Sequence, residues 1–260
     1  MSRNFELMQL AGRGGEFVLP SAAPTAPDAP VAAAAATLPS MAREASGGGD
    51  LDELAGQESL RLVQRIFLLQ SQPPARMVVF AGVDHGNGVS RLCARTAETL
   101  TSNVTGSVCL VDGNFRSPGL PELFGTTNHY GLTDSLLRQG PIRSFIKLLR
   151  DPNLYLLSCG ALAADSPNLL NSNRVKERFA ELRKEFDYVL IDAPPLTRYS
   201  DAIALGKLTD GFVLVLEAHS TRRETAVAMA ENLRAAHIPI LGAVFNKRTF
   251  PIPESLYNKL

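Results

Sequence analysis

Residues 80–90 read FAGVDHGNGVS and join an apolar run to a stretch with helical periodicity. A glycine-rich turn between a strand and a helix lets successive backbone N–H groups face an anion at the helix N-terminus. The residues that we expect to hold phosphate groups in this way are Gly86, Asn87, Gly88, Val89, Ser90 and Arg91. The usual phosphate-loop pattern ends in Gly-Lys-Ser/Thr, whereas this one ends in Gly88-Val89-Ser90. The glycines and the hydroxyl are kept, but an apolar side chain stands where a lysine is usual.

Two further apolar runs end in an aspartate. Residues 108–112 read VCLVD and residues 188–192 read YVLID. The carboxyl ends of parallel strands meet at one edge of a sheet, so Asp112 and Asp192 should lie near the Ser90 hydroxyl. Carboxylate and hydroxyl oxygens suit Mg²⁺ or its water shell. The sequence therefore predicts a magnesium site formed by Ser90, Asp112 and Asp192.

Short apolar runs alternate with helical stretches along most of the chain. The runs, each apolar on both faces, are Met77–Ala81, Val108–Val111, Leu154–Leu157, Tyr188–Ile191, Phe212–Leu216 and Ile240–Phe245. Such runs are typical of parallel strands that helices cover on both sides. The helices expected between them are Ser90–Leu100, Leu132–Leu137, Ile142–Leu149, Arg174–Phe186, Tyr199–Leu208 and Thr221–His237. This alternation predicts an α/β fold with a doubly wound, mostly parallel sheet that binds its ligand at the carboxyl ends of the strands.

The composition changes near residue 50, and this change sets the expected domain boundaries. Residues 19–50 consist mostly of Ala, Pro, Ser and Gly without an aromatic side chain, so we expect a disordered linker. Residues 1–18 are either a short docking helix or a disordered terminus. One phosphate-loop domain is expected over residues 51–248, beginning with a helix that ends before Pro73. Residues 249–260 form a C-terminal tail.

The overall composition argues against several classes of protein. The formal net charge is +0 at pH 7, whereas nucleic-acid-binding domains usually carry a basic excess. No apolar run reaches the ~20 residues that a membrane-spanning helix needs, and the N-terminus lacks a signal-peptide pattern. We therefore expect a cytoplasmic protein that reaches a membrane only through a partner. Cys93, Cys109 and Cys159 lack metal-site spacing and are expected to be buried and reduced.

The three strand ends, taken in order, resemble the Walker A, Walker A′ and Walker B motifs of bacterial tyrosine kinases of the CpsD/CapB type. These kinases are relatives of the MinD/ParA ATPases. The Walker A′ pattern of the family, Asp-x-Asp-x-Arg-x-Pro, is matched by Asp112, Asn114, Arg116 and Pro118. The Walker B pattern, Asp-x-Pro-Pro, is matched by the segment 192–195, DAPP. The resemblance covers about residues 58–248.

This resemblance implies a phosphate-loop NTPase fold of the MinD/ParA type that binds ATP or ADP with Mg²⁺. It makes Asp112, Asn114 and Asp192 the candidate catalytic residues and Arg116 a further phosphate contact. The implied activity is tyrosine autophosphorylation in exopolysaccharide or capsule synthesis, with a membrane polysaccharide co-polymerase or chain-length regulator as partner. The protein would then act at the inner face of the membrane. The oligomerising helix of the family is approximated by Glu58, Arg61 and Arg65, and the candidate phosphoacceptor is Tyr257.

Three departures from the family pattern leave the activity open. Val89 replaces the Walker A lysine, Asn114 replaces the second Walker A′ acid, and Tyr257 stands in the tail where a tyrosine cluster is usual. One hypothesis is a pseudokinase with weak or lost kinase activity. The first alternative is an active autokinase that uses a substitute basic residue, such as Arg91, Arg116 or one from a neighbouring subunit. The second alternative is a MinD/ParA-like spatial regulator, although the sequence shows neither a long C-terminal amphipathic helix nor a basic stripe.

Overall fold

The computed structural model describes residues 49–69, 74–161, 169–170 and 172–248, with no side-chain description before residue 56. The chain divides into the units Met1–Ser46 and Gly47–Leu260, and every described residue belongs to the second unit. The predictions for residues 1–18, for most of the linker 19–50, for the tail 249–260 and for Tyr257 lie outside the described residues. The first helix, α1, spans Gly49–Val63 and thus begins two residues before the expected start of the domain at residue 51.

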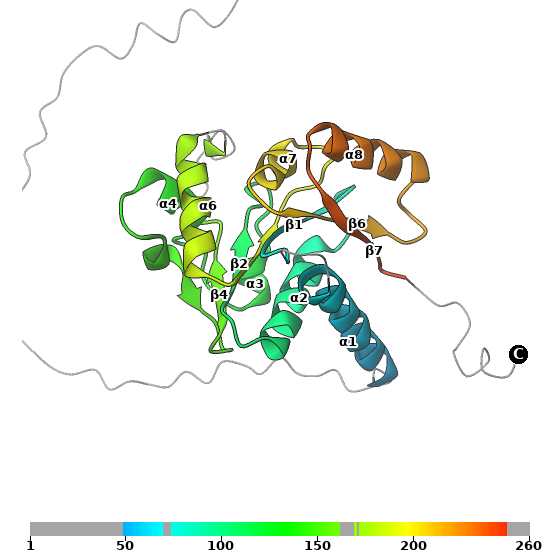
Figure 1. The fold of residues 1–260 in the computed structure, drawn as a ribbon, viewed down its shortest axis with the longest axis horizontal. Helices are drawn as coiled ribbons and strands as arrows, with labels where there is room; N and C mark the ends of the chain where they lie inside the picture. The colour runs from blue at the N-terminus through cyan, green and yellow to red at the C-terminus, as the bar shows by residue number, and fades with distance from the viewer. Residues whose placement is uncertain (1–48, 70–73, 162–168, 171, 249–260) are drawn as a thin grey trace, which may run out of the picture. The chain divides into compact units, whose positions relative to one another are not determined.

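The centre of the domain is a seven-stranded sheet with the order β3-β4-β2-β5-β1-β6-β7 (Figure 1). The strands are β1 (Met77–Gly82), β2 (Val108–Asp112), β3 (Lys147–Leu148), β4 (Leu154–Leu157), β5 (Tyr188–Asp192), β6 (Gly211–Glu217) and β7 (Ile240–Asn246). All neighbouring pairs are parallel except β3 with β4. The predicted doubly wound, mostly parallel fold is therefore confirmed.

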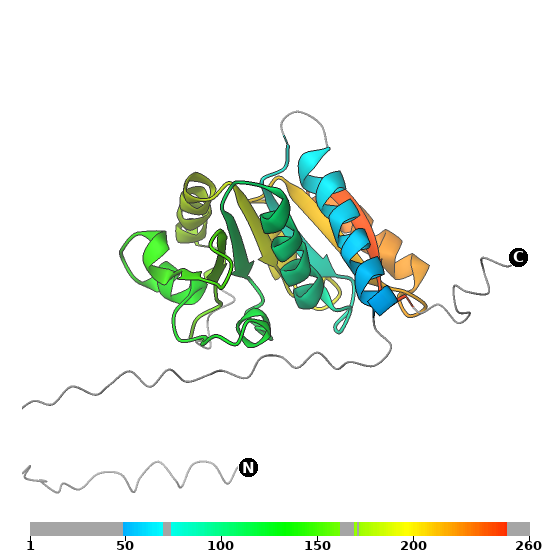
Figure 2. The same cartoon turned by 90° about the horizontal axis from the view of Figure 1, so that it is seen from below.

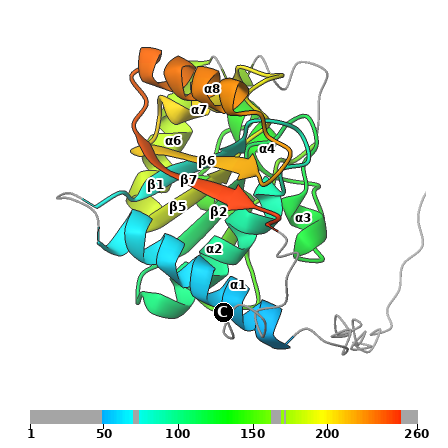
Figure 3. The ribbon, with the colours of Figure 1, turned by 90° about the vertical axis from the view of Figure 1, so that its right-hand side faces the viewer.

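Helices cover both faces of the sheet, as Figure 3 shows. One face carries α1, the π-helical turn η1 (Gln64–Leu68), α2 (Val89–Asn103) and the short α3 (Leu120–Leu123). The opposite face carries α4 (Leu132–Leu137), the 3₁₀ turn η2 (Ile142–Phe145), α6 (Asn173–Glu185), α7 (Asp201–Gly206) and α8 (Arg223–Ala235). Figure 2 shows α1 and α2 side by side across the first face. Each layer shields the apolar side chains of one strand face from water.

The central strands are buried on both faces, but the edge strand β7 is not. Every residue of β1 and β2 is buried. None of the residues of β7 is buried, and the side chain of Phe245 is 67% exposed. The expectation that both faces of every apolar run are covered is therefore wrong for Ile240–Phe245, because an edge strand has a neighbour on one side only. The three cysteines are buried and unpaired, as predicted.

The predicted helix Ile142–Leu149 is also wrong. The chain makes the short turn η2 and then extends into β3, which pairs with β4 in antiparallel register. Two contacts favour the extended form: the Leu149 N–H donates to the Leu154 carbonyl at 2.9 Å, and Lys147 Nζ donates to the Thr127 carbonyl at 2.7 Å. These tertiary hydrogen bonds outweigh the local helical pattern, which is a weak preference in a stretch this short.

Candidate functional site

The strands that carry the three motifs are neighbours in the sheet. The order β2-β5-β1 brings the ends of these strands together at one sheet edge. Asp112 and Asp192 are direct partners in the register of β2 and β5. The Gly113 N–H donates to the Asp192 carbonyl at 2.8 Å, which fixes the two strand ends against each other. Topology thus places the two aspartates beside the loop that follows β1.

The glycine-rich loop between β1 and α2 is shaped by backbone conformations that favour glycine. Gly86 has φ 87° and Gly88 has φ 77°, both in the left-handed region. Asn87, which is buried, accepts a hydrogen bond from the Asp84 N–H at 2.8 Å through its side-chain oxygen. Gly88 is the N-cap residue of α2 and, as a glycine, has no side chain with which to cap this helix end. The N-terminus of α2 therefore offers N–H groups to an anion.

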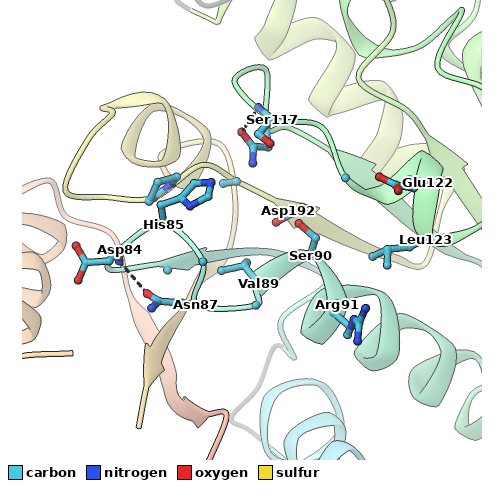
Figure 4. Close-up of a pocket in the computed structure, with 17 residues that line it drawn as sticks. Asp84, His85, Asn87, Val89, Ser90, Arg91, Ser117, Glu122, Leu123 and Asp192 are labelled. Carbon is cyan, nitrogen blue, oxygen red and sulfur yellow. Dashed lines mark hydrogen bonds between the residues drawn. The ribbon is translucent and has the colours of Figure 1, made fainter. Parts of the chain in front are cut away.

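A cavity of about 340 Å³ opens above this loop. Its walls come from the loop itself, from the segment after β2, from α3 and from the segment after β5 (Figure 4). Of the predicted site residues, the cavity brings together Gly86, Asn87, Gly88, Val89, Ser90, Arg91, Asn114 and Asp192. The size and the lining suit a ligand larger than a metal ion, with a polyanionic part near the helix end.

Asp192 is the buried acidic group that faces this cavity. In Figure 4 its carboxylate lies next to the Ser90 side chain. Neither carboxylate oxygen has a hydrogen-bond partner within the described chain. Burial and the charge of Asp112 raise the pKa of Asp192 well above its ordinary value, against a smaller opposing effect of the Ser90 hydroxyl. An unpartnered buried carboxylate beside a hydroxyl fits a divalent cation, which would satisfy both oxygens.

Asp112 is turned toward the backbone instead. Its carboxylate accepts hydrogen bonds from the Asn114 N–H at 3.2 Å and from the Leu120 N–H at 3.1 Å. Burial raises the pKa of Asp112 to about 7, although the backbone N–H groups counteract this rise. Asp112 is not among the residues that line the cavity. In this conformation the carboxylate organises the loop after β2, and its role as a metal ligand stays a prediction.

Asn114 and Arg116, the other Walker A′ residues, also hold this loop together. The Asn114 side-chain oxygen accepts hydrogen bonds from the N–H groups of Arg116 and Ser117 at 3.2 and 3.1 Å. The Arg116 guanidinium bonds Asp201 at 3.2 Å and lies 4.5 Å from the centre of the Tyr199 ring. Arg116 therefore binds the segment after β5 and does not line the cavity.

The lysine position of the loop carries no charge. The Val89 side chain is partly buried and packs against the apolar core under α2. Arg91, two residues further along α2, is exposed and lines the cavity. It is the only arginine or lysine among the lining residues that the structure describes.

Sequence reasoning missed three acidic residues at this edge, since Asp84 of the loop also lines the cavity. Glu122 of α3 lines the cavity, and no motif marks it. Glu217 closes the apolar run of β6 and bonds the Asn87 side-chain amide at 3.3 Å. The signal that identified Asp112 and Asp192, an acid directly after an apolar run, applies equally to Glu217.

The predicted oligomerising residues lie outside this site. Glu58 and Arg61 form an ion pair of 2.6 Å on α1, with both side chains exposed. Arg65, in η1, is also exposed. Among the described helices, none combines the length and the apolar character needed to cross a membrane.

Comparison with curated proteins finds bacterial tyrosine kinases. The chain is 29% identical over 171 residues to tyrosine-protein kinase YwqD of Bacillus subtilis, covering 66% of this chain and 72% of that protein. It is 29% identical over 195 residues to tyrosine-protein kinase wzc of Salmonella typhi, covering 74% of this chain but only 27% of that protein. No family model matches the chain.

Solved structures show the same fold at low sequence identity. The chimerical protein CapA2B2 aligns with a TM-score of 0.70 and 22% identity, over 75% of this chain and 85% of that one. The VpsO kinase domain aligns with a TM-score of 0.69 and 22% identity, over 77% and 100% of the two chains. The septum site-determining protein MinD of Pyrococcus horikoshii, complexed with Mg-ADP, has a TM-score of 0.57, 20% identity and coverage of 70% and 76%. The resemblance to bacterial tyrosine kinases and to the MinD/ParA fold is thus confirmed.

Proposed function

We propose that this chain is a nucleotide-binding protein of the bacterial tyrosine-kinase type that acts in exopolysaccharide or capsule synthesis or export, with weak or lost kinase activity. The observation that carries the proposal is the unpartnered carboxylate of Asp192 beside Ser90, in a cavity whose phosphate loop has Val89 at the lysine position. The unpartnered carboxylate supports binding of Mg²⁺ and nucleotide. The valine at the lysine position explains why phosphoryl transfer would be slow.

The phosphates of ATP or ADP would lie against the backbone N–H groups of Gly86–Ser90 and the N-terminus of α2. Ser90 and Asp192 would hold Mg²⁺, with Asp112 behind them on the neighbouring strand. The metal ion would neutralise phosphate charge and help to orient the terminal phosphoryl group. Asn114 would contribute only its neutral amide where the family pattern has a second acid.

Transfer of the phosphoryl group should suffer more than binding. A lysine at position 89 would counter the negative charge that shifts during transfer, and catalysis depends on interactions that strengthen in the transition state. Losing one such preorganised donor typically costs about 10²–10³ in rate. The loop N–H groups remain, so affinity for the ground-state nucleotide should fall much less.

An active autokinase that uses a substitute basic residue is the second candidate. The position of Arg91 on the cavity wall favours it. Under this alternative the arginine would reach the phosphates from the first turn of α2, and Tyr257 would be an acceptor.

Partners and location follow from the resemblance to the kinase family. We propose a membrane polysaccharide co-polymerase or chain-length regulator as partner, and a cytoplasmic protein held at the inner face of the membrane by it. Glu58, Arg61 and Arg65 present exposed charges on α1 and η1 that suit contact with a second copy of the chain.

The test is a paired measurement of nucleotide affinity, with and without Mg²⁺, and of phosphotyrosine formation. It compares the wild type with Val89→Lys and Val89→Lys/Asn114→Asp. We expect weak Mg²⁺-dependent binding and little phosphotyrosine in the wild type, and tighter binding in Val89→Lys because a lysine charge adds to the loop. Robust autophosphorylation by the wild type would contradict weak or lost activity and favour the second candidate. Absence of nucleotide binding in every variant would overturn the nucleotide site itself.

A further inference from the structure

The end of β7 lies directly against the last glycine of the phosphate loop. A Cβ atom at Gly88 would come within 2.6 Å of Asn246 Nδ2 and 3.8 Å of Lys247 Cε. The Asn246 side-chain amide donates to the Asn87 carbonyl at 2.8 Å, across 159 residues of sequence. The side chain of Lys247, which follows β7, would therefore contact a side chain placed at Gly88, so it lies close to the loop that lacks a lysine.

The position of Lys247 is imposed by its surroundings. Its backbone is in the left-handed region at φ 56°, which is uncommon for a residue other than glycine. Its ammonium group donates to one oxygen of Glu217 at 3.3 Å. The other oxygen of Glu217 accepts from the Asn87 side chain, also at 3.3 Å. Glu217 thus holds the lysine and the phosphate loop at the same time.

We propose that Lys247 supplies the positive charge that Val89 cannot supply, by moving from Glu217 to the phosphate groups of a bound nucleotide. This inference rests on the proposed nucleotide site. In the structure Lys247 bonds Glu217 and is not among the residues lining the cavity, so its side chain must rotate when a nucleotide binds. The lysine side chain is 48% exposed, and an exposed ion pair contributes little stability. A polyphosphate carries more negative charge than the single carboxylate and would win the exchange.

The other basic side chains near the site are less suitable. Arg116 is engaged by Asp201 and lies over the Tyr199 ring. In Figure 4, Val89 and Ser90 lie between His85 and Arg91, so Arg91 extends from α2 on the side away from the start of the loop. Lys247 approaches the loop at Gly88, next to the helix N-terminus where phosphate oxygens would gather.

The experiment is a titration of the full chain with Mg-ADP for the wild type, Lys247→Met, Lys247→Arg, Glu217→Gln and Arg91→Ala. Lys207→Met is the matched control, because Lys207 is an exposed lysine lining a different groove. We expect Lys247→Met to weaken binding about tenfold and Lys247→Arg to keep most of the affinity. Glu217→Gln should tighten binding by up to about fivefold, because the neutral amide competes less for the lysine. Lys207→Met should match the wild type.

The outcomes separate this inference from the proposed function. If Lys247→Met and Glu217→Gln both bind Mg-ADP with the affinity of the wild type, the role of Lys247 is overturned. The proposed nucleotide site would still stand. A tenfold loss in Arg91→Ala with none in Lys247→Met assigns the charge to Arg91 and also overturns it. Failure of the wild type to bind Mg-ADP refutes the nucleotide site and the inference together. If Lys247→Met melts at a lower temperature by circular dichroism, Glu217→Gln decides the question, since unchanged binding there contradicts the exchange.

Discussion

Replacing Asp192 by asparagine should stabilise the metal-free protein at high pH. The carboxylate of Asp192 is buried, both of its oxygens lack hydrogen-bond partners among the described residues, and Asp112 lies beside it. An ionised carboxylate in this setting is unfavourable, so the pKa is raised and the group keeps its proton longer than in the unfolded chain. Asparagine has nearly the same shape and cannot ionise.

The sign of the pH dependence follows from the raised pKa values. Both aspartates bind protons more tightly in the folded state, so their contribution to stability is present at low pH and is lost as the pH rises. For Asp112, a pKa raised from 3.8 to about 7 corresponds to roughly 4 kcal/mol, present below about pH 4 and lost as the pH passes about 7. The pKa of Asp192 is raised as well. A buried polar group without hydrogen-bond partners costs about 1–3 kcal/mol, and more when it is charged, so removing the charge of Asp192 should recover about 2 kcal/mol or more at pH 8 and change little at pH 4.

Urea denaturation followed by circular dichroism measures the effect, because the chain has no tryptophan for fluorescence. Asp187→Asn is the matched control, since hydrogen bonds from Ser107 lower the pKa of Asp187 and its substitution should act in the opposite direction. Added Mg²⁺ should stabilise the wild type at pH 8 and leave Asp192→Asn unchanged. Equal destabilisation of Asp192→Asn at pH 4 and pH 8 would refute the reasoning. It would mean that the fold does not raise the pKa of the Asp192 carboxyl group.

Two further predictions concern a buried arginine away from the site and a glycine of the phosphate loop. Arg178→Met should destabilise the domain by at least about 3 kcal/mol, because the buried guanidinium bonds three backbone carbonyls, those of Ser135, Arg138 and Gly140. A loss below about 1 kcal/mol in urea denaturation would mean that water replaces these bonds. Gly88→Ala should lower the free energy of unfolding by about 1–3 kcal/mol and weaken nucleotide binding. The added methyl group would strain a left-handed backbone and would clash with the Asn246 side chain. Gly86→Ala is its control, since Gly86 is also left-handed but has open space around it; equal effects of the two substitutions on binding would argue against the contact with Asn246.

The local pattern of apolar and polar residues was sufficient to predict most of the strands and helices of the fold. Each of the six predicted apolar runs became a strand. Burial on both faces explains the apolar side chains of the inner strands, whereas β7 is not buried and is held by its pairing with β6. The glycine-rich turn was predictable because the left-handed backbone at Gly86 and Gly88 favours glycine at those positions. The helix Ile142–Leu149 failed because its periodicity spans barely two turns, and contacts with Leu154 and Thr127 decided its conformation.

The sequence by itself determined the strand–loop–helix unit at residues 77–103, the aspartates that end β2 and β5, and the absence of a lysine at position 89. Only the tertiary structure decided that Asp192 faces the cavity while Asp112 bonds the backbone, and that β7 brings Lys247 to Gly88. Hydrophobic periodicity and glycine placement act over a few residues and can be read along the chain. Some side-chain contacts of the site join residues more than a hundred positions apart, such as Asn87 with Glu217 and with Asn246, so they exist only once the sheet has ordered its strands.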